Sequence, residues 1–148
     1  ARATTEALRA AERLREVGLA SDEAAGLIDQ IARASTHGSG ERLVLGKGGE
    51  TGIYIQEALK NGGTYYETAP GFYDAIGRNT DMAWEVNERC IRNQLEAGVP
   101  RIDYVGEEVA YTLEHSIGTF RWREVTFLLD HADEYGYKLV GNSWIKVP

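Results

Sequence analysis

The chain has few of the side chains that hold small folds together covalently or through metals. Cys90 is the single cysteine among 148 residues, so an internal disulfide framework and a cysteine-built zinc site are excluded. The three histidines, His37, His115 and His131, are dispersed and lack the spacing of a metal-binding motif. The sequence therefore predicts no bound metal and no resident cofactor.

Long apolar runs are also missing. The longest are only a few residues, such as residues 125–129, which Thr126 interrupts, whereas a bilayer span needs roughly 20 apolar residues. We therefore expect no membrane span. Residues 1–4 also lack the apolar stretch of a secretory signal. If the domain is exported, the signal is expected in a larger parent chain upstream.

Basic residues are in deficit. Lysine and arginine total 16 against 23 acidic residues, which gives a net charge of -7. This net negative charge disfavours sequence-independent binding to the phosphate backbones of DNA or RNA, because such binding depends on clustered Lys and Arg. It suits a specific basic protein partner. The hydrophobic content of 43% is that of an ordinary folded domain.

The first quarter of the chain predicts a helical leader. Residues 4–35 show two short amphipathic patterns separated by Gly18, which is a typical helix stop, and by Ser21, which is a typical helix start. Residues 36–40 are small, polar and glycine-rich, as in a linker. We therefore predict a helical leader and linker over residues 1–40 and a compact domain over residues 41–148.

Strand and helix patterns alternate after Glu41. Strands are expected at 42–45, 64–68 and 101–105, helices at 53–59, 80–97, 107–115 and 119–135, and a closing hairpin at 137–140 and 143–147. The order predicts an α/β fold, with α+β as the alternative: a small mixed sheet of about five strands packed with helices, preceded by an N-terminal helical hairpin.

A glycine-rich loop follows the first of these strands. Lys47, Gly48 and Gly49 lie between a strand and a helix start, where backbone N–H groups and the helix dipole can hold an anion. The loop matches neither a P-loop nor a dinucleotide-binding fingerprint. It is therefore a candidate phosphate-binding loop, with a plain flexible turn as the alternative.

The last long helix carries a candidate catalytic carboxylate. Helical spacing places Glu124 at the edge of an apolar stripe, and burial there would raise its pKa and suit it to acid–base work. The alternative is an ion pair with Arg121 or Arg123.

Further polar side chains precede this helix. His115 and Thr119 lie close in sequence to Arg121 and Arg123. We expect the two arginines and Lys47 to hold phosphate and Thr119 to assist orientation. Histidine, hydroxyl, arginine and glutamate are the residue types of a metal-independent ribonuclease, in which acid–base groups move protons and a cation stabilises the phosphorane. A surface histidine is the alternative interpretation of His115.

A different chemistry is suggested by the second expected strand, residues 64–68. Tyr65 could stack on a base or nicotinamide, and Glu67 could stabilise an oxocarbenium ion while the glycine loop holds a pyrophosphate. Strand packing explains these residues equally well.

Three stretches together resemble a known family. They are 52–58 running into 62–66, 84–87 running into 101–106, and 119–124 running to Gly136, Tyr137 and 141–144. They resemble the C-terminal toxin domains of bacterial polymorphic toxins of the Rhs and contact-dependent growth inhibition types. The resemblance covers residues 41–148.

The resemblance implies a domain secreted as part of a larger protein and delivered to the cytoplasm of a competing cell, where a cognate immunity protein neutralises it. It does not fix the activity. We expect a metal-independent ribonuclease, with transfer RNA as one possible target. An NAD-consuming enzyme (a glycohydrolase or an ADP-ribosyltransferase) and a non-enzymatic binding domain are the alternatives.

Overall fold

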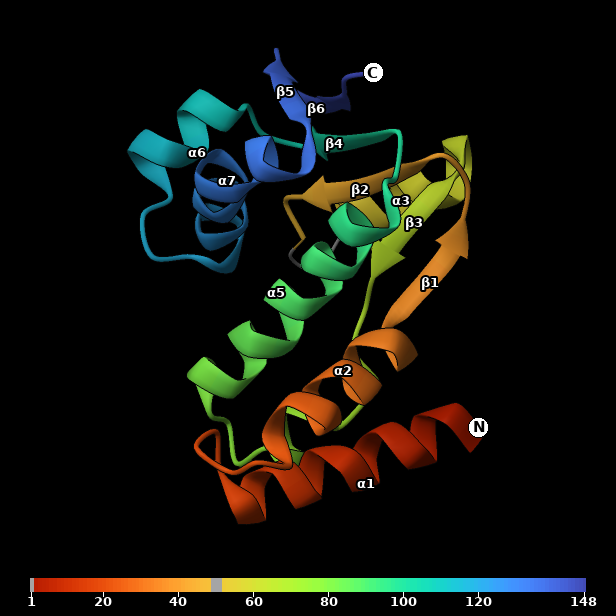
Figure 1. The fold of residues 1–148 in the computed structure, drawn as a ribbon, viewed down its shortest axis with the longest axis vertical. Helices are drawn as coiled ribbons and strands as arrows, with labels where there is room; N and C mark the ends of the chain where they lie inside the picture. Colours follow the sequence, from red (N-terminus) through yellow and green to blue (C-terminus); the bar gives the residue numbers. More distant parts are fainter. Residues whose placement is uncertain (1, 49–51) are drawn as a thin grey trace. The chain divides into compact units, whose positions relative to one another are not determined.

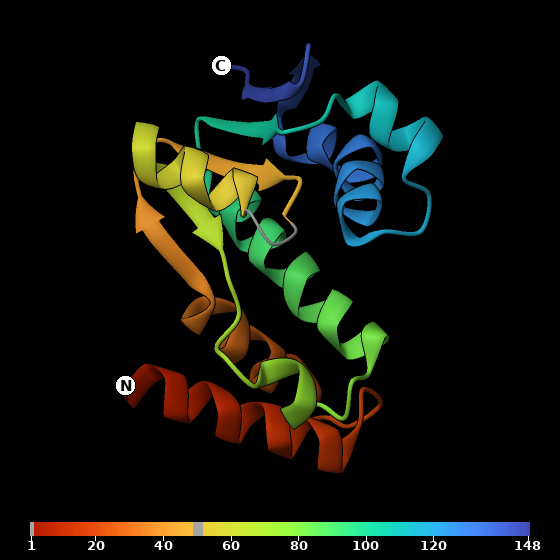
Figure 2. The ribbon, with the colours of Figure 1, turned by 180° about the vertical axis from the view of Figure 1, so that it is seen from behind.

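The computed structural model describes residues 2–48 and 52–148 (Figures 1 and 2). Across these residues the chain forms seven α-helices and a six-stranded mixed sheet, with a helical pair at the N-terminus. The predicted mixed α/β fold is therefore confirmed. In the part of the chain that the structure describes, no helix has both the length and the apolar character required to cross a bilayer.

The chain divides into two compact units. Unit 1 comprises residues 1–37 and 66–92, and unit 2 comprises residues 38–65 and 93–148. Three elements are shared: β1 (Thr36–Ser39) begins in unit 1, β3 (Gly63–Tyr66) has its last residue in unit 1, and α5 (Thr80–Ala97) ends in unit 2. The boundary of a functional domain at Glu41 stays a prediction.

Unit 1 is helical. It contains α1 (Arg2–Val17), α2 (Ala24–Ala34), the short α4 (Phe72–Ala75) and most of α5. The inner face of α1 is a stripe at the spacing of an amphipathic helix, and its buried members are Ala7, Ala10, Ala11 and Leu14. Three of the four are alanines, and α1 packs on α2. The predicted pair of N-terminal helices is confirmed.

Unit 2 holds the sheet and the helices that cover it. Its further elements are β2 (Arg42–Gly46), α3 (Ile53–Asn61), β3 (Gly63–Tyr66), β4 (Arg101–Val105), α6 (Val109–His115), α7 (Phe120–His131), the 3-10 turn η1 (Ala132–Tyr135), β5 (Tyr137–Val140) and β6 (Ser143–Lys146). The strand order is β1-β3-β2-β4-β6-β5. Strand β2 is parallel to both β3 and β4, whereas β6 is antiparallel to β4 and β5. The predicted terminal hairpin is confirmed.

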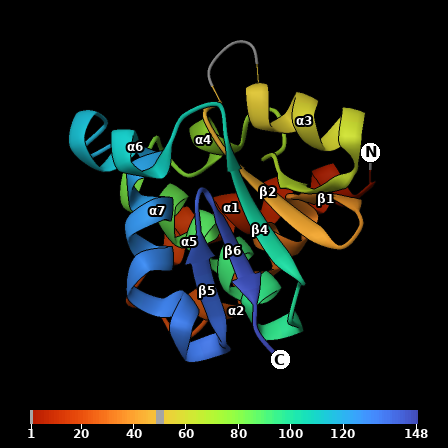
Figure 3. The same cartoon turned by 90° about the horizontal axis from the view of Figure 1, so that it is seen from above.

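The two faces of the sheet differ in polarity. Alternation along β2 and β4 puts Leu43, Ile102 and Tyr104 on one face, and Arg42 and Asp103 on the other. Helix α3 covers the polar face, where its Glu57 pairs with Arg42, and α7 packs against β2 on the side opposite α3 (Figure 3). The core of unit 2 therefore lies between the sheet and α7.

The carboxyl ends of β2 and β4 approach each other closely at a glycine. Gly46 faces Val105 in the parallel register and has a φ of 141°. A Cβ on Gly46 would lie 2.0 Å from the carbonyl oxygen of Val105. Just beyond it, the Lys47 amide donates to that oxygen at 3.1 Å. Only glycine fits this backbone position.

The sheet reverses its direction of growth between these two strands. After β2 the chain adds β3 on one side, and it later adds β4 on the other side. In open α/β sheets, ligands bind outside the carboxyl ends of the strands at such a switch point. The loops that leave β2 and β4 are therefore the place to look for a site.

One secondary-structure prediction was wrong. Residues 36–39 form strand β1 instead of an irregular linker, which raises the strand count above the expected five. Glycine allows this strand to approach its neighbour, because a Cβ on Gly38 would lie 2.3 Å from the Gly63 carbonyl oxygen. The glycine that suggested a linker therefore allows β1 and β3 to pack closely.

We expect Gly46→Ala to destabilise the fold by roughly 2–4 kcal/mol, because it adds backbone strain and a clash with β4. The measurement is urea unfolding followed by circular dichroism. Gly98→Ala is the matched control. Gly98 also has a positive φ, but nothing lies within 4 Å of its added Cβ, so only the strain of about 1–2 kcal/mol is expected. Equal losses in the two variants would contradict a tight contact between β2 and β4.

Candidate functional site

A buried carboxylate lies just beyond the carboxyl end of β4. The side chain of Glu107 is only 7% exposed. Its Oε2 accepts hydrogen bonds from Thr112 Oγ1 at 2.5 Å, Arg121 Nε at 2.9 Å and Ser116 Oγ at 3.2 Å. Burial by itself raises the pKa of Glu107, but the hydrogen bonds from Thr112 and Arg121 and the charge of Arg121 outweigh it. The pKa therefore lies below its ordinary value, and the group is ionised at neutral pH.

Arg121 holds this cluster together from the first turn of α7. Besides the contact of its Nε with Glu107, its Nη2 donates to Ser116 Oγ at 3.1 Å. The Arg121 side chain is 27% exposed. It therefore neutralises the buried carboxylate without being fully buried itself.

Tyr104 extends the cluster into the core. Its hydroxyl lies 2.6 Å from Thr112 Oγ1. Because Thr112 donates its own proton to Glu107, Tyr104 is the donor in that contact. The pKa of Tyr104 is raised to about 12, chiefly by burial, and the negative charges of Glu107 and Glu124 act in the same direction. Tyr104 therefore keeps its proton, and both carboxyl groups act on it.

Glu124 occupies the position that helical spacing predicted. It is one turn beyond Arg121 on α7 and is 7% exposed, so the predicted burial is confirmed. Arg121 pairs with Glu107. The charges of Glu107, Glu124 and Arg121 all act on Tyr104, and this group of four residues is named here the β4-end cluster.

The turn of the terminal hairpin fixes the loop that carries Glu107. The carbonyl oxygen of Asn142 accepts from the Tyr104 amide at 2.9 Å, and its Oδ1 accepts from the Val109 amide at 2.9 Å. Residue Glu108 at the N-cap of α6 makes no side-chain capping bond. Asn142 therefore supplies the missing cap and holds both ends of the Gly106–Glu108 segment.

The other predicted residues of this region have more local contacts. Thr119 caps α7 by accepting from the Trp122 amide, and its hydroxyl donates to the Ser116 carbonyl. The Arg123 guanidinium lies 5.6 Å from the centre of the Phe120 ring.

His115 is the last residue of α6, and its side chain is exposed. Its imidazole packs on the Tyr111 ring, with 4.4 Å between ring centres, and its Nε2 lies 3.8 Å from Glu114. The next residue, Ser116, belongs to the Glu107 contacts. The catalytic role of His115 stays a prediction.

The glycine loop begins next to the segment that carries Glu107. The side chain of Lys47 is exposed, and its Cβ lies 3.0 Å from where a Cβ of Gly106 would stand. Gly48 lies against the ring of Tyr54. Gly49 lies outside the described residues. Lys47 is thus the cation that the structure brings to the adjacent strand end.

The residues of the alternative NAD chemistry fall in different compact units. Tyr65 is half-buried on β3 in unit 2. Glu67 is exposed and belongs to unit 1, where its backbone contacts Ser35 and His37. Their joint role in a site stays a prediction.

A second charged cluster lies near the opposite end of the same two strands. The guanidinium of Arg42 donates to the Gly62 carbonyl oxygen, to Asp103 at 3.0 Å and to Glu57 at 2.6 Å. Asp103 also accepts from Arg101 at 2.9 Å. All three guanidinium nitrogens of Arg42 donate to protein groups, and these contacts connect α3, β2 and β4. We therefore assign this cluster a structural role.

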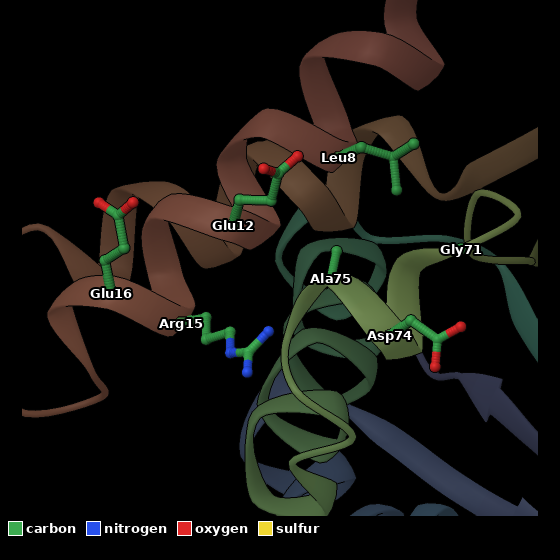
Figure 4. A pocket seen from close by; sticks show the side chains of 7 residues that line it. All are labelled: Leu8, Glu12, Arg15, Glu16, Gly71, Asp74 and Ala75. Atoms are coloured by element: carbon green, nitrogen blue, oxygen red, sulfur yellow. The ribbon is translucent and has the colours of Figure 1, made fainter.

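The depression shown in Figure 4 lies in unit 1, between α1 and α4, and measures about 670 Å³. Its charged residues are Glu12, Arg15 and Glu16 of α1 and Asp74 of α4. All four are exposed, and buried polar groups of the kind seen around Glu107 do not line it. The β4-end cluster is therefore the better candidate for chemistry.

Metal binding can be examined over residues 2–48 and 52–148. No group of three or more His, Cys, Asp or Glu side chains in these ranges is placed to hold an ion.

Sequence reasoning missed two members of the β4-end cluster. The sequence pattern predicts only that Glu107 opens a helix and that Tyr104 lies in a strand. A usable signal was present, because Glu107 directly follows a strand beside the glycine loop, where parallel strands end together. The partner of Glu107 could not be found this way, since Arg121 comes from another helix.

Comparison with known proteins adds no family, since no protein-family model, curated protein or solved structure matches the chain.

We expect Glu107→Gln to lower the thermal unfolding midpoint at neutral pH and to lose this effect in acid. The folded pKa of Glu107 is below its ordinary value of 4.5. Its ionised contacts therefore stabilise the protein fully above that value, and the contribution is lost as pH falls through the folded pKa. The measurement is the midpoint of both proteins from pH 7 to pH 3.

Glu108→Gln is the matched control, because its exposed carboxyl adjoins Glu107 in the chain. A midpoint difference between wild type and Glu107→Gln that stays constant over the whole pH range would show that the ion pair with Arg121 does not stabilise the fold.

Proposed function

We propose that this chain is an antibacterial effector toxin domain that cleaves RNA without a metal, with transfer RNA as the first target to examine. The β4-end cluster is the observation that carries the proposal. It combines the buried carboxyl of Glu124 with a partly exposed arginine at the carboxyl end of a parallel strand, at the switch point of the sheet. Metal-free RNA cleavage requires an acid–base group and a cation of this kind.

Each group has a defined part in the proposed reaction. Glu124 accepts the proton of the ribose 2′-hydroxyl, and the 2′ oxygen then attacks the adjacent phosphorus. The Arg121 guanidinium, held in place by Glu107, stabilises the charge on the phosphorane. His115 donates a proton to the leaving 5′ oxygen. Lys47, exposed at the end of β2, attracts the flanking phosphate.

The biological setting follows from the resemblance to polymorphic toxins. The domain would be secreted within a larger parent protein, act in the cytoplasm of the target cell and be neutralised by a cognate immunity protein. The net charge of -7 supports this, since it favours a protein partner of opposite charge.

Charge also favours a second candidate, an NAD-consuming enzyme. Unit 2 carries 8 basic and 12 acidic residues. This net negative charge repels a small dinucleotide less than it repels a long polyanion such as RNA. The switch point of an α/β sheet is also a common nucleotide-binding position.

The test is Glu124→Gln, which keeps the size of the side chain and removes its proton-accepting charge. With total RNA as substrate, we expect the variant to cleave roughly 10²- to 10⁴-fold more slowly than wild type. Asp130→Asn is the matched control, because Asp130 is an exposed acid on the same helix. It should cleave at the wild-type rate.

Intact transfer and ribosomal RNA at high concentrations of the wild-type protein would contradict the proposal. In that case, loss of NAD from a treated lysate would support the second candidate. Harmless expression in the bacterial cytoplasm, with RNA and NAD both unchanged, would support the binding-domain alternative.

A further inference from the structure

A pocket of about 480 Å³ lies within unit 1, between α2 and the part of α5 that belongs to that unit. The two helices are in contact there (Figures 1 and 2). The α5 wall consists of four charged residues that share one helical face: Glu85, Glu88, Arg89 and Arg92. The α2 wall consists of Ala25, Gly26, Ile28 and Asp29. The pocket therefore combines a charged wall with a largely apolar one.

One charge of the pocket lacks a partner among the described residues. Asp29 is 3.3 Å from Arg89, and Glu88 is 3.4 Å from Arg92. The carboxylate of Glu85, in contrast, makes no hydrogen bond and no ion pair within residues 2–48 and 52–148. This carboxylate is therefore available to a ligand that enters the pocket.

The surroundings of Glu85 disfavour an unpaired negative charge. The residue is half-buried, and burial together with the charges of Glu88 and Asp81 raises the pKa of its carboxyl above the ordinary value. A cation that reaches such a carboxylate neutralises it and donates charge-assisted hydrogen bonds to it. A positively charged donor is therefore bound more strongly here than a neutral one.

The apolar wall contains a glycine that neither packing nor backbone conformation requires. Gly26 lies inside helix α2, where glycine is less favourable than any residue except proline. It is not among the glycines with a positive φ, and a Cβ added to it would meet no atom within 4 Å. The effect of Gly26 is therefore to leave open space on the wall that it forms with Ala25 and Ile28.

The charge and the walls of the pocket favour a single cation on an aliphatic stem. The three acids and two arginines that line it give a net charge of −1, so one positive group neutralises the pocket. A divalent metal ion exceeds this charge and would also face the two arginines. A lysine or arginine side chain carries one charge, and its methylene groups pack on apolar surface.

We propose that the pocket between α2 and α5 binds a lysine or arginine side chain of a protein partner. The positive group pairs with Glu85, and the aliphatic stem lies against Ala25, Gly26 and Ile28. The net charge of -7 on the whole chain attracts a partner of opposite charge. The pocket contains no residue of the β4-end cluster, and the inference does not depend on the proposed ribonuclease activity.

The experiment is an NMR titration of the full chain with Nα-acetyl-arginine amide at physiological ionic strength. The reporters are the backbone amide of Gly26 and the methyl groups of Ile28, and we expect both to follow one saturation curve. The neutral analogue Nα-acetyl-citrulline amide has the same shape but lacks the charge that pairs with Glu85. It should bind roughly 10- to 150-fold more weakly.

Two variants separate pairing from folding. Glu85→Gln keeps the size of the side chain and removes its charge, so it should weaken binding of the arginine derivative by a similar factor. Because Glu85 has no partner among the described residues, its loss should not lower the thermal unfolding midpoint at neutral pH. Glu12→Gln is the matched control, because Glu12 is an exposed glutamate of unit 1 at the depression of Figure 4. It should preserve the wild-type affinity.

Saturable binding of the arginine derivative that depends on both its charge and Glu85 supports the proposal. Reporters that do not shift, equal affinities of wild type and Glu85→Gln, or equal affinities of the arginine and citrulline derivatives would overturn it. Tighter binding of spermidine than of the arginine derivative at the same reporters would also overturn it, since a free polyamine would then be the favoured ligand.

Discussion

The parallel pairing of β2 with β4 is the constraint on which the candidate site depends. Gly46 lets the two backbones meet at Val105, closer than any side chain would permit. The loops that follow both strands therefore start from one point, with Lys47 on one and Glu107 on the other. Because the strand order reverses here, neither loop is covered by a helix that connects the two strands. Backbone geometry thus creates the place where the polar groups gather.

The same two strands carry charge at both ends, with different consequences. Near their amino ends, Arg42 is bonded to Glu57, Asp103 and a carbonyl oxygen, which makes a closed network that orders α3 on the sheet. At the carboxyl end, Arg121 satisfies Glu107 and is still partly exposed. Buried ion pairs add little net stability because desolvation offsets their attraction. The two arginines differ in exposure, which is 27% for the Arg121 side chain and 19% for that of Arg42.

Local signals predicted the elements well, because caps, stops and periodicity act within a few residues. Thr119 as a cap and the burial of Glu124 both followed from such spacing. Strand β1 was missed because Gly38 allows a close contact with Gly63, a partner distant in sequence. The role of Glu107 was missed for the same reason: its arginine is 14 residues away on another helix. Both strand β1 and the role of Glu107 depend on contacts between residues that are distant in sequence, and no local pattern predicts such contacts.

The central claim is that protein side chains alone activate the ribose 2′-hydroxyl at this strand end. The most direct test is the chemistry of the new RNA ends formed by the wild-type protein in excess EDTA. Attack by the 2′ oxygen leaves a 2′,3′-cyclic phosphate and a 5′-hydroxyl, and the account predicts both products, at a rate that the chelator does not change. Products with a 5′-phosphate and a 3′-hydroxyl, or cleavage abolished by EDTA and restored by Mg²⁺, would contradict it.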